Sequence, residues 1–210
     1  VNAAAVPDGV GGVILVWEDH RYYSASGSHT YAQRLDANGT PRWYASGVRL
    51  CTFPLSELHP RLAPDGAGGA IVVWNDSRAG RSYGQRIGAS GSLLWGDQGL
   101  QLCTASGSRE VADVLSDGVG GAIVVWLDQR SAPYDVFAQR VSGAGTLLWG
   151  GGGVSICAAE GAQHSIHAVV DGAGGAVVAW TDERDLYPVI YAQRVNASGT
   201  PLWTVDGVPI

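Results

Sequence analysis

The sequence has 210 residues, of which 46% are hydrophobic and 15% charged, so it can bury one substantial core or a string of small ones. All 13 basic residues are arginines, and the net charge of -6 argues against a phosphate-binding surface, so we expect no nucleic-acid partner. The apolar runs are about five residues long, far below the roughly 20 that a membrane-spanning helix needs, and no membrane insertion is expected.

One sequence unit recurs four times along the chain. Each copy begins with the motif DGxGG, whose aspartate lies nine residues before the tryptophan of a WxDxR motif. An aromatic-x-Gln-Arg motif follows, and a second tryptophan comes twelve residues after its aromatic residue. The first tryptophans of the copies are Trp17, Trp74, Trp126 and Trp180, and the second are Trp43, Trp95, Trp149 and Trp203.

Each copy predicts four short strands in chain order. The first covers residues 58–63, with counterparts at 1–6, 109–115 and 164–170. DGxGG then predicts a hairpin turn, because glycine supplies the positive φ that such a turn requires. The following apolar run predicts a strand covered on both faces. The aromatic-x-Gln-Arg motif predicts a third strand, and the stretch from the second tryptophan to the cysteine a fourth.

A period near 50 residues with fixed element lengths is typical of propellers and related arrays. One such unit cannot bury both of its faces alone, so each copy must stack on its neighbours, with the tryptophans as the main apolar contacts. We therefore predict an all-β fold of β-propeller type, with four-stranded antiparallel blades in a closed four-bladed ring, or in an arc that is part of a larger ring or array. The domain spans residues 1–210, with blades at about 1–51, 58–103, 109–157 and 164–210.

The two ends of the sequence fall in repeat register. The last copy stops at Ile210, one residue before its expected cysteine, and the chain begins with Val1. We therefore expect a processed product or a segment of a longer protein. Because such units present the same edges to one another, self-association through the repeat ends is also expected.

The string DGxGGAIVVWxDxR, followed by YAQRVxxxGxxLWxxxGVxIC, resembles a repeat of large secreted and cell-surface bacterial proteins of β-propeller type. The resemblance covers essentially the whole chain and implies an extracellular or cell-surface location. The turn DANGTPRW at 36–43 is also similar to the Asp-box of sialidase-type propellers, which lies between the third and fourth strands of a blade. Asp36 keeps the aspartate, and the other copies have Gly88, Ser142 and Asn196 there. The similarity implies blade architecture and does not extend to glycosidase activity.

The aspartate and arginine of WxDxR and the arginine of the Gln-Arg motif recur in every copy. A catalytic site repeated fourfold is not expected, whereas a bidentate arginine-carboxylate brace between neighbouring strands is; a ligand contact is the alternative. The predicted braces consist of Asp19, Arg21 and Arg34, of Asp76, Arg78 and Arg86, of Asp128, Arg130 and Arg140, and of Asp182, Arg184 and Arg194.

We predict no catalytic residue, no cofactor and no metal site. The sequence lacks a GxSxG nucleophile motif and a phosphate-binding glycine loop. Its isolated acids do not by spacing alone exclude a catalytic pair of carboxylates. DGxGG offers one carboxylate, which is too few for calcium. His164 and His167, three apart on a predicted strand, are expected on opposite faces. Cys51, Cys103 and Cys157 occupy one repeat position, too far apart for disulfides, and are expected to be buried.

The copies differ in length only between WxDxR and the next aromatic residue. These variable loops are rich in tyrosine and resemble a recognition face, because tyrosine offers contact area at small entropic cost; drift of a solvent loop is the alternative. They cover residues 22–30, 79–82, 131–136 and 185–190. The candidate binding residues are Tyr22, Tyr23, His29, Arg81, Tyr134, Asp135 and Tyr187.

Three functions remain open at this point. The first is a non-enzymatic extracellular module for adhesion, or for recognition of a glycan or protein surface through the variable loops. The second is a structural subunit that assembles into a ring or filament. The third is a glycosidase or lyase on a propeller scaffold, which is disfavoured because no asymmetric cluster of catalytic residues stands out.

Overall fold

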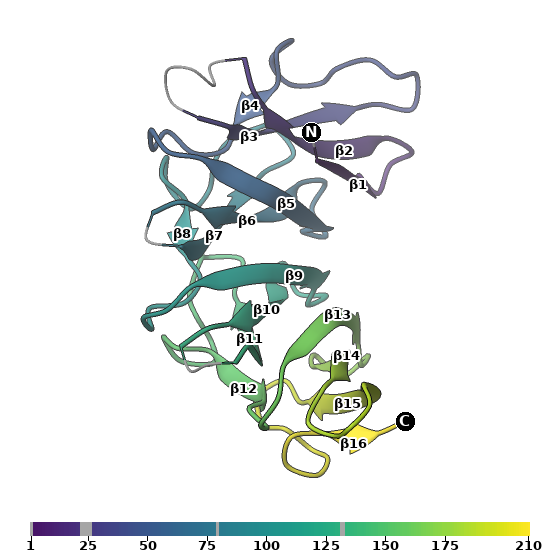
Figure 1. Ribbon diagram of the computed structural model, residues 1–210. Coiled ribbons are helices and arrows are strands. Elements are labelled where there is room, and N and C mark those ends of the chain that lie inside the picture. Colours follow the sequence, from purple (N-terminus) through teal and green to yellow (C-terminus); the bar gives the residue numbers. More distant parts are fainter. Residues whose placement is uncertain (1, 22–26, 79, 131–132) are drawn as a thin grey trace.

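Sixteen strands in four sheets make up the computed structural model, which describes residues 2–21, 27–78, 80–130 and 133–210 (Figure 1). The first sheet contains β1 (Ala3–Pro7), β2 (Val13–Asp19), β3 (His29–Leu35) and β4 (Val48–Arg49). The second contains β5 (Glu57–Pro64), β6 (Ala70–Asp76), β7 (Arg81–Ile87) and β8 (Leu100–Gln101). The third contains β9 (Arg109–Ser116), β10 (Ala122–Asp128), β11 (Asp135–Val141) and β12 (Val154–Cys157). The fourth contains β13 (Gln163–Val170), β14 (Ala176–Asp182), β15 (Val189–Val195) and β16 (Val208–Pro209).

Every sheet is antiparallel and its strands follow chain order, so each is one blade built by simple hairpin connections. The prediction of an all-β chain with four four-stranded antiparallel blades is confirmed. Among the described residues there is no helix long and apolar enough to cross a membrane. The three cysteines are buried and free, as the sequence predicts.

The blades follow one another along an arc, with the N-terminal and C-terminal blades at its two ends (Figure 1). The first strands of neighbouring blades are in contact, β1 with β5, β5 with β9, and β9 with β13, so these strands form the inner side of the arc. The fourth blade leaves Val169 and Ile190 exposed on a sheet face that no further blade covers in the described structure. Of the two predicted geometries, the structure therefore has the arc.

The hydrophobic core lies between the blades, in three clusters that each join two consecutive sheets. On β6, Ala70, Val72 and Trp74 pack toward the first blade, while Ile71 and Val73 pack toward the third. Alternate residues of one strand thus enter different clusters. This arrangement explains why the second strand of each copy is a continuous apolar run.

The glycine four residues after the second tryptophan is required by close packing. Gly153 has φ 70°, and a Cβ there would lie 2.5 Å from Cη2 of Trp126 and 2.7 Å from the backbone oxygen of Ala138. Gly150 has φ 77°, and a Cβ there would meet nothing within 4 Å. Because Gly150 and Gly153 have similar φ, comparing them distinguishes the cost of steric overlap from that of backbone strain.

Replacing Gly153 with alanine is therefore expected to lower the free energy of unfolding by about 3 kcal/mol, from backbone strain plus overlap with a fully buried indole. Gly150→Ala carries the strain alone and is expected to lose about 1 kcal/mol. Chemical denaturation of both variants measures the difference. Equal losses would show that Trp126 does not pack against this turn.

Candidate functional site

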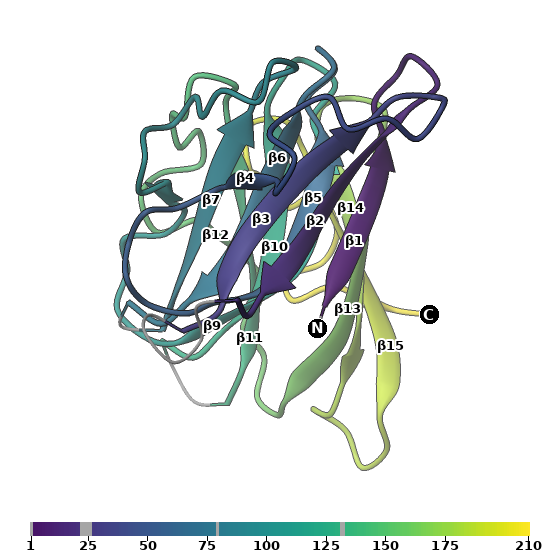
Figure 2. The same cartoon turned by 90° about the horizontal axis from the view of Figure 1, so that it is seen from above.

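The described parts of the variable loops lie at the end of the molecule opposite the DGxGG hairpins, because each second strand runs from the hairpin to the loop (Figure 2). Tyr22 and Tyr23 lie outside the described residues. Tyr187 and its neighbour Leu186 are strongly exposed, at 73% and 88%. Tyr134 and Arg81 are half-buried, and Nη1 of Arg81 donates a hydrogen bond to Oε1 of Gln101 at 3.2 Å.

Two of the candidate binding residues are not at the loop surface. His29 and Asp135 are the first residues of β3 and β11, and both are buried. Each strand takes in the last two residues of the loop range inferred from the sequence, 22–30 or 131–136, and its first side chain is buried. The prediction that they contact a ligand on the loop surface is corrected accordingly.

His29 belongs to a buried polar cluster between the first two blades. Its Nδ1 lies 3.4 Å from Oε1 of Glu57, and the backbone N–H of Thr30 donates to the other carboxylate oxygen at 2.7 Å. Nη2 of Arg49 lies 3.1 Å from Nδ1 of His29 and donates to the backbone oxygen of Phe53 at 3.0 Å. His29 is 1% exposed, and Glu57 and Thr30 are fully buried.

Burial sets the protonation of this cluster. Desolvation raises the pKa of Glu57 to about 8, although the Thr30 N–H and the nearby Arg49 charge oppose the rise. Desolvation also lowers the pKa of His29, with the Arg49 charge acting in the same direction. Both groups are therefore expected to be neutral near pH 7. In the sequence, Glu57 is an isolated acid. The one sign that its position is polar in every such copy is that Arg109 and Gln163 occupy it in the next two copies.

The aspartate of WxDxR is enclosed by donors. Asp128 accepts hydrogen bonds from the indole of Trp126 at 2.7 Å and from the backbone N, Nε and Nη2 of Arg130 at 2.8, 2.9 and 2.7 Å. The Arg130 guanidinium lies 3.8 Å from the ring centroid of Phe137 and donates to the backbone oxygen of Gly152. The same aspartate-arginine pair is present in every blade, at Asp19 and Arg21, Asp76 and Arg78, and Asp182 and Arg184. Its two residues are two apart in the sequence, whereas the predicted brace joins neighbouring strands.

The arginine of the Gln-Arg motif pairs with a different aspartate from the one predicted. Nε of Arg86 donates to Oδ2 of Asp65, the aspartate of DGxGG, at 3.0 Å. Oδ1 of Asp65 accepts the backbone N–H groups of Ala67 and Gly69, which closes the hairpin. The other blades repeat this ion pair with Arg34 and Asp8, Arg140 and Asp117, and Arg194 and Asp171. With two repeated aspartates available, the sequence alone does not decide which one the arginine binds.

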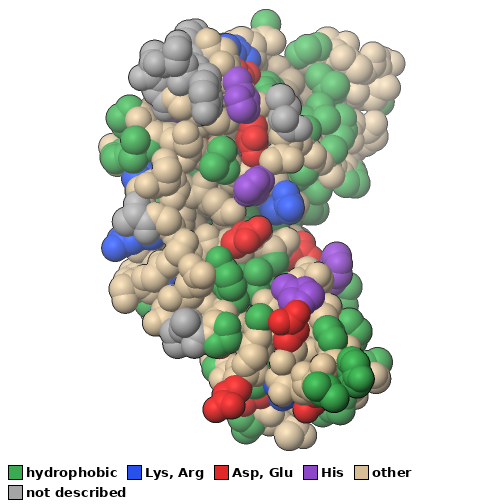
Figure 3. Space-filling model, viewed as in Figure 1, with side chains coloured by type: hydrophobic (Ala, Val, Ile, Leu, Met, Phe, Trp, Pro, Cys, Tyr) green, Lys and Arg blue, Asp and Glu red, His purple; other side chains and the backbone are tan. Residues whose placement is uncertain are grey.

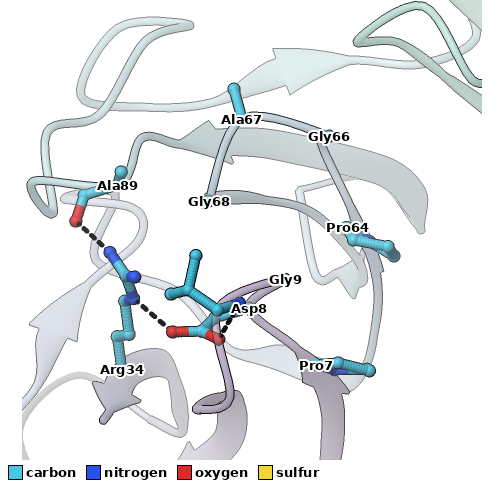
Figure 4. Close-up of a pocket in the computed structure, with 10 residues that line it drawn as sticks. Pro7, Asp8, Gly9, Arg34, Pro64, Gly66, Ala67, Gly68 and Ala89 are labelled. Carbon is cyan, nitrogen blue, oxygen red and sulfur yellow. Dashed lines mark hydrogen bonds and ion pairs between the residues drawn. The ribbon is translucent and has the colours of Figure 1, made fainter.

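A groove with a volume of about 510 Å³ lies between the DGxGG hairpins of the first two blades (Figure 4). Its charged lining residues, Asp8 and Arg34, bind each other, and Arg34 also donates to the backbone oxygen of Ala89. The rest of the lining is backbone and small apolar side chains, including Pro7 and Pro64. The groove therefore offers shape and backbone groups, with its two charges already paired.

Exposed titratable side chains lie along the inner strands on the face that carries the variable loops. They are His59 and Arg61 on β5, Glu110 on β9, and His164 and His167 on β13. Figure 3 shows histidine and acidic side chains gathered along this inner side. Nε2 of His164 lies 3.2 Å from Oε1 of Glu183. No group of three or more His, Cys, Asp or Glu residues suited to a metal ion occurs within the part of the chain that is described.

The expected placement of His164 and His167 on opposite faces assumed a regular strand. The pairing of β13 with β14 shifts register between these two residues, and Ser165 has φ 54°. Simple alternation does not apply across such a bulge. Both histidine side chains reach solvent, while Ile166 and Ala168 are buried.

No protein-family profile and no curated protein matches the sequence. Among solved structures, the chain is similar to a puromycin hydrolase, with a TM-score of 0.53 and 15% identity over 95% of this chain and 30% of the hydrolase. It is also similar to an endo-arabinase from Bacteroides thetaiotaomicron, with a TM-score of 0.51 and 12% identity over 99% of this chain and 78% of the arabinase. At these identities the likeness concerns the fold, and the chain spans under a third of the hydrolase. Four stacked antiparallel blades and these neighbours define a β-propeller protein.

Proposed function

We propose that this propeller is a non-enzymatic binding module that recognises a glycan or protein surface through its variable-loop end, in an extracellular or cell-surface setting. The observation that carries the proposal is how the polar side chains are used. The aspartates and arginines repeated in every blade bind one another and the backbone, so they serve the scaffold. The exposed loop side chains differ from copy to copy.

The loop of the fourth blade shows this contrast most clearly. Leu186 and Tyr187 project an apolar and an aromatic side chain into solvent, next to the half-buried Arg184 of the repeated brace. An exposed tyrosine on a rigid strand-supported loop supplies contact area and a hydroxyl at low entropic cost, which suits glycan or protein recognition.

A glycan array tests the proposal with two variants that remove exposed apolar side chains at opposite ends of the molecule. Leu186→Ser combined with Tyr187→Ser is expected to reduce the signal of any bound glycan about tenfold or more. Val10→Ser combined with Val119→Ser, at exposed hairpin positions, is expected to leave that signal unchanged. Loss in the second variant alone, or equal binding by both variants and the parent, would contradict recognition through the loops.

A turnover assay accompanies the array, because a hydrolase and an arabinase are among the structural neighbours. The parent chain is expected to release no product from any glycan that it binds. Release of sugar at a rate that depends on His164 or Glu110 would replace the binding proposal with a glycosidase or lyase on the inner side.

A further inference from the structure

Every junction between consecutive blades uses the same two donors and one acceptor. At the first junction, Nε1 of Trp43 and Nη1 of Arg34 donate to the backbone oxygen of Ala89, at 3.0 and 3.3 Å. The same bonds occur at the second junction, from Trp95 and Arg86 to Gly143, and at the third, from Trp149 and Arg140 to Ala197. We call the tryptophan and arginine the donor pair.

The acceptor belongs to a tight turn whose glycine makes room for the indole. A Cβ added at Gly91 would lie 2.9 Å from Cγ of Trp43, and one at Gly199 would lie 2.7 Å from Cγ of Trp149. A junction therefore consists of a donor pair on one blade and, on the next, a turn with a free carbonyl and a glycine two residues later. We call the latter the glycine turn.

The fourth blade presents a donor pair without an acceptor. The indole Nε1 of Trp203 donates to none of the described residues, and this side chain is 40% exposed, whereas Trp149 is buried. The Arg194 side chain keeps its ion pair with Asp171 but is 37% exposed, compared with 14% for Arg140. No carbonyl within the described ranges takes the place that Ala197 has at the third junction.

The first blade presents the complementary glycine turn without a tryptophan. Ala37 occupies the position of Ala89, and its backbone oxygen accepts no hydrogen bond from the described part of the chain. Gly39 has φ 77°, and a Cβ there would meet nothing within 4 Å, unlike its counterparts Gly91 and Gly199.

The two end blades also leave apolar side chains uncovered on the same outer faces. On the fourth blade, Ile190 is 47% exposed, whereas its counterpart Val136 is fully buried at the third junction. On the first blade, Leu15 and Trp17 are half-buried, whereas Trp74, the counterpart of Trp17, is fully buried. Each end face thus exposes the residues that the internal junctions cover.

We propose that a second copy of this chain docks head to tail, with Trp203 and Arg194 of one copy on the glycine turn of the other, at the backbone oxygen of Ala37 and beside Gly39. The contact repeats the three internal junctions, so its chemistry is already present in the fold. It joins two different surfaces, and such a heterologous contact gives a ring if the rotation closes and an open chain if it does not. Two copies would supply eight blades, a number within the usual range of closed propellers.

Sedimentation velocity of the 210-residue chain over a range of concentrations tests the contact with one variant on each side. Trp203→Ala removes the central donor and its apolar surface, and is expected to weaken association about 30-fold or more. Gly39→Asn is expected to do the same, because a Cβ there meets the incoming indole while asparagine tolerates the positive φ. Gly96→Asn is the matched control: it has φ 78° and nothing within 4 Å, and association should be unchanged.

Mixing the two defective variants distinguishes head-to-tail docking from other contacts. A Trp203→Ala chain keeps an intact glycine turn, and a Gly39→Asn chain keeps an intact donor pair, so the mixture is expected to form heterodimers with a single junction. Each variant alone should be monomeric, with the melting temperature that the parent has at concentrations where it is dissociated. A parent chain that is monomeric at hundreds of micromolar, or a mixture that stays monomeric while the parent associates, would overturn the proposal.

Discussion

Replacement of Asp128 by alanine is expected to lower the free energy of unfolding by about 4 kcal/mol, the largest loss among single substitutions in the braces. Asp128 is fully buried and is the partner of two arginines, because Nε of Arg109 donates to Oδ2 at 3.1 Å in addition to the bonds from Arg130. The Arg109 side chain is fully buried as well. Alanine would leave its charge and the indole N–H of Trp126 without a carboxylate inside the core.

Asp19→Ala provides the matched control for Asp128→Ala. Asp19 occupies the same repeat position, but its partner Arg21 is far more exposed than Arg109, so solvent can replace the lost bonds. We expect a loss of about 1 kcal/mol for this variant. Urea denaturation of both variants gives the comparison. Equal losses would mean that the buried Arg109 adds nothing to the cost of removing Asp128.

Acid should reveal the same carboxylate. Burial acts to raise the pKa of Asp128, but hydrogen bonds from Arg130 and Trp126 outweigh it and hold the pKa below its usual value. A lowered pKa stabilises the fold above the unfolded value of 3.8, and this contribution is lost as the pH falls through the folded pKa. The Asp128→Ala variant should therefore lose less stability than the parent below pH 4.

Glu57→Gln is expected to stabilise the protein at alkaline pH and to change little at pH 5. Burial raises the pKa of Glu57 from 4.5 to about 8. A raised carboxyl pKa gives stability that is complete below 4.5 and is lost as the pH rises through 8, because the unfolded chain ionises while the folded chain resists. Glutamine cannot ionise and still offers an oxygen to the Thr30 N–H and donors toward His29.

The expected gain at pH 9 is about 4 kcal/mol in the free energy of unfolding, measured by denaturation of parent and variant at pH 5, 7 and 9. Glu160→Gln, an exposed substitution of the same chemistry, serves as the control and should give no pH-dependent difference. A constant difference between parent and Glu57→Gln across this range would show that Glu57 is ionised in the folded protein at neutral pH.

The fold was predictable because the same local pattern occurs four times. Each copy repeats the glycine turns, the tryptophans and the apolar strand that is covered on both faces. A strand that is ambiguous in one copy can therefore be assigned from the other three. Trp74, for example, is buried between blades as its repeat position indicates. The arc was not decided by the sequence, because closure depends on the rotation between blades, which no local motif encodes.

The pairing of polar groups was only partly predictable. The bonds between Asp76 and Arg78 follow from their separation by two residues, but the bond between Arg86 and Asp65 depends on which strands become neighbours. His29 was misplaced because a strand start and a loop end look alike in a polar segment. The proposed docking faces could not be predicted either, because Trp203 has the same sequence context as Trp43, Trp95 and Trp149, which are buried or half-buried.

Hydrogen exchange of the tryptophan indoles, followed by nitrogen-15 NMR, tests most directly the claim that four equal blades are joined by repeated junctions. In a monomeric Gly39→Asn background, Trp74, Trp126 and Trp180, whose indoles bond buried aspartates, should exchange slowest, and Trp203 fastest. Trp43, Trp95 and Trp149 should fall between them. Exchange of Trp74, Trp126 and Trp180 as fast as that of Trp203 would contradict the stacked-blade structure.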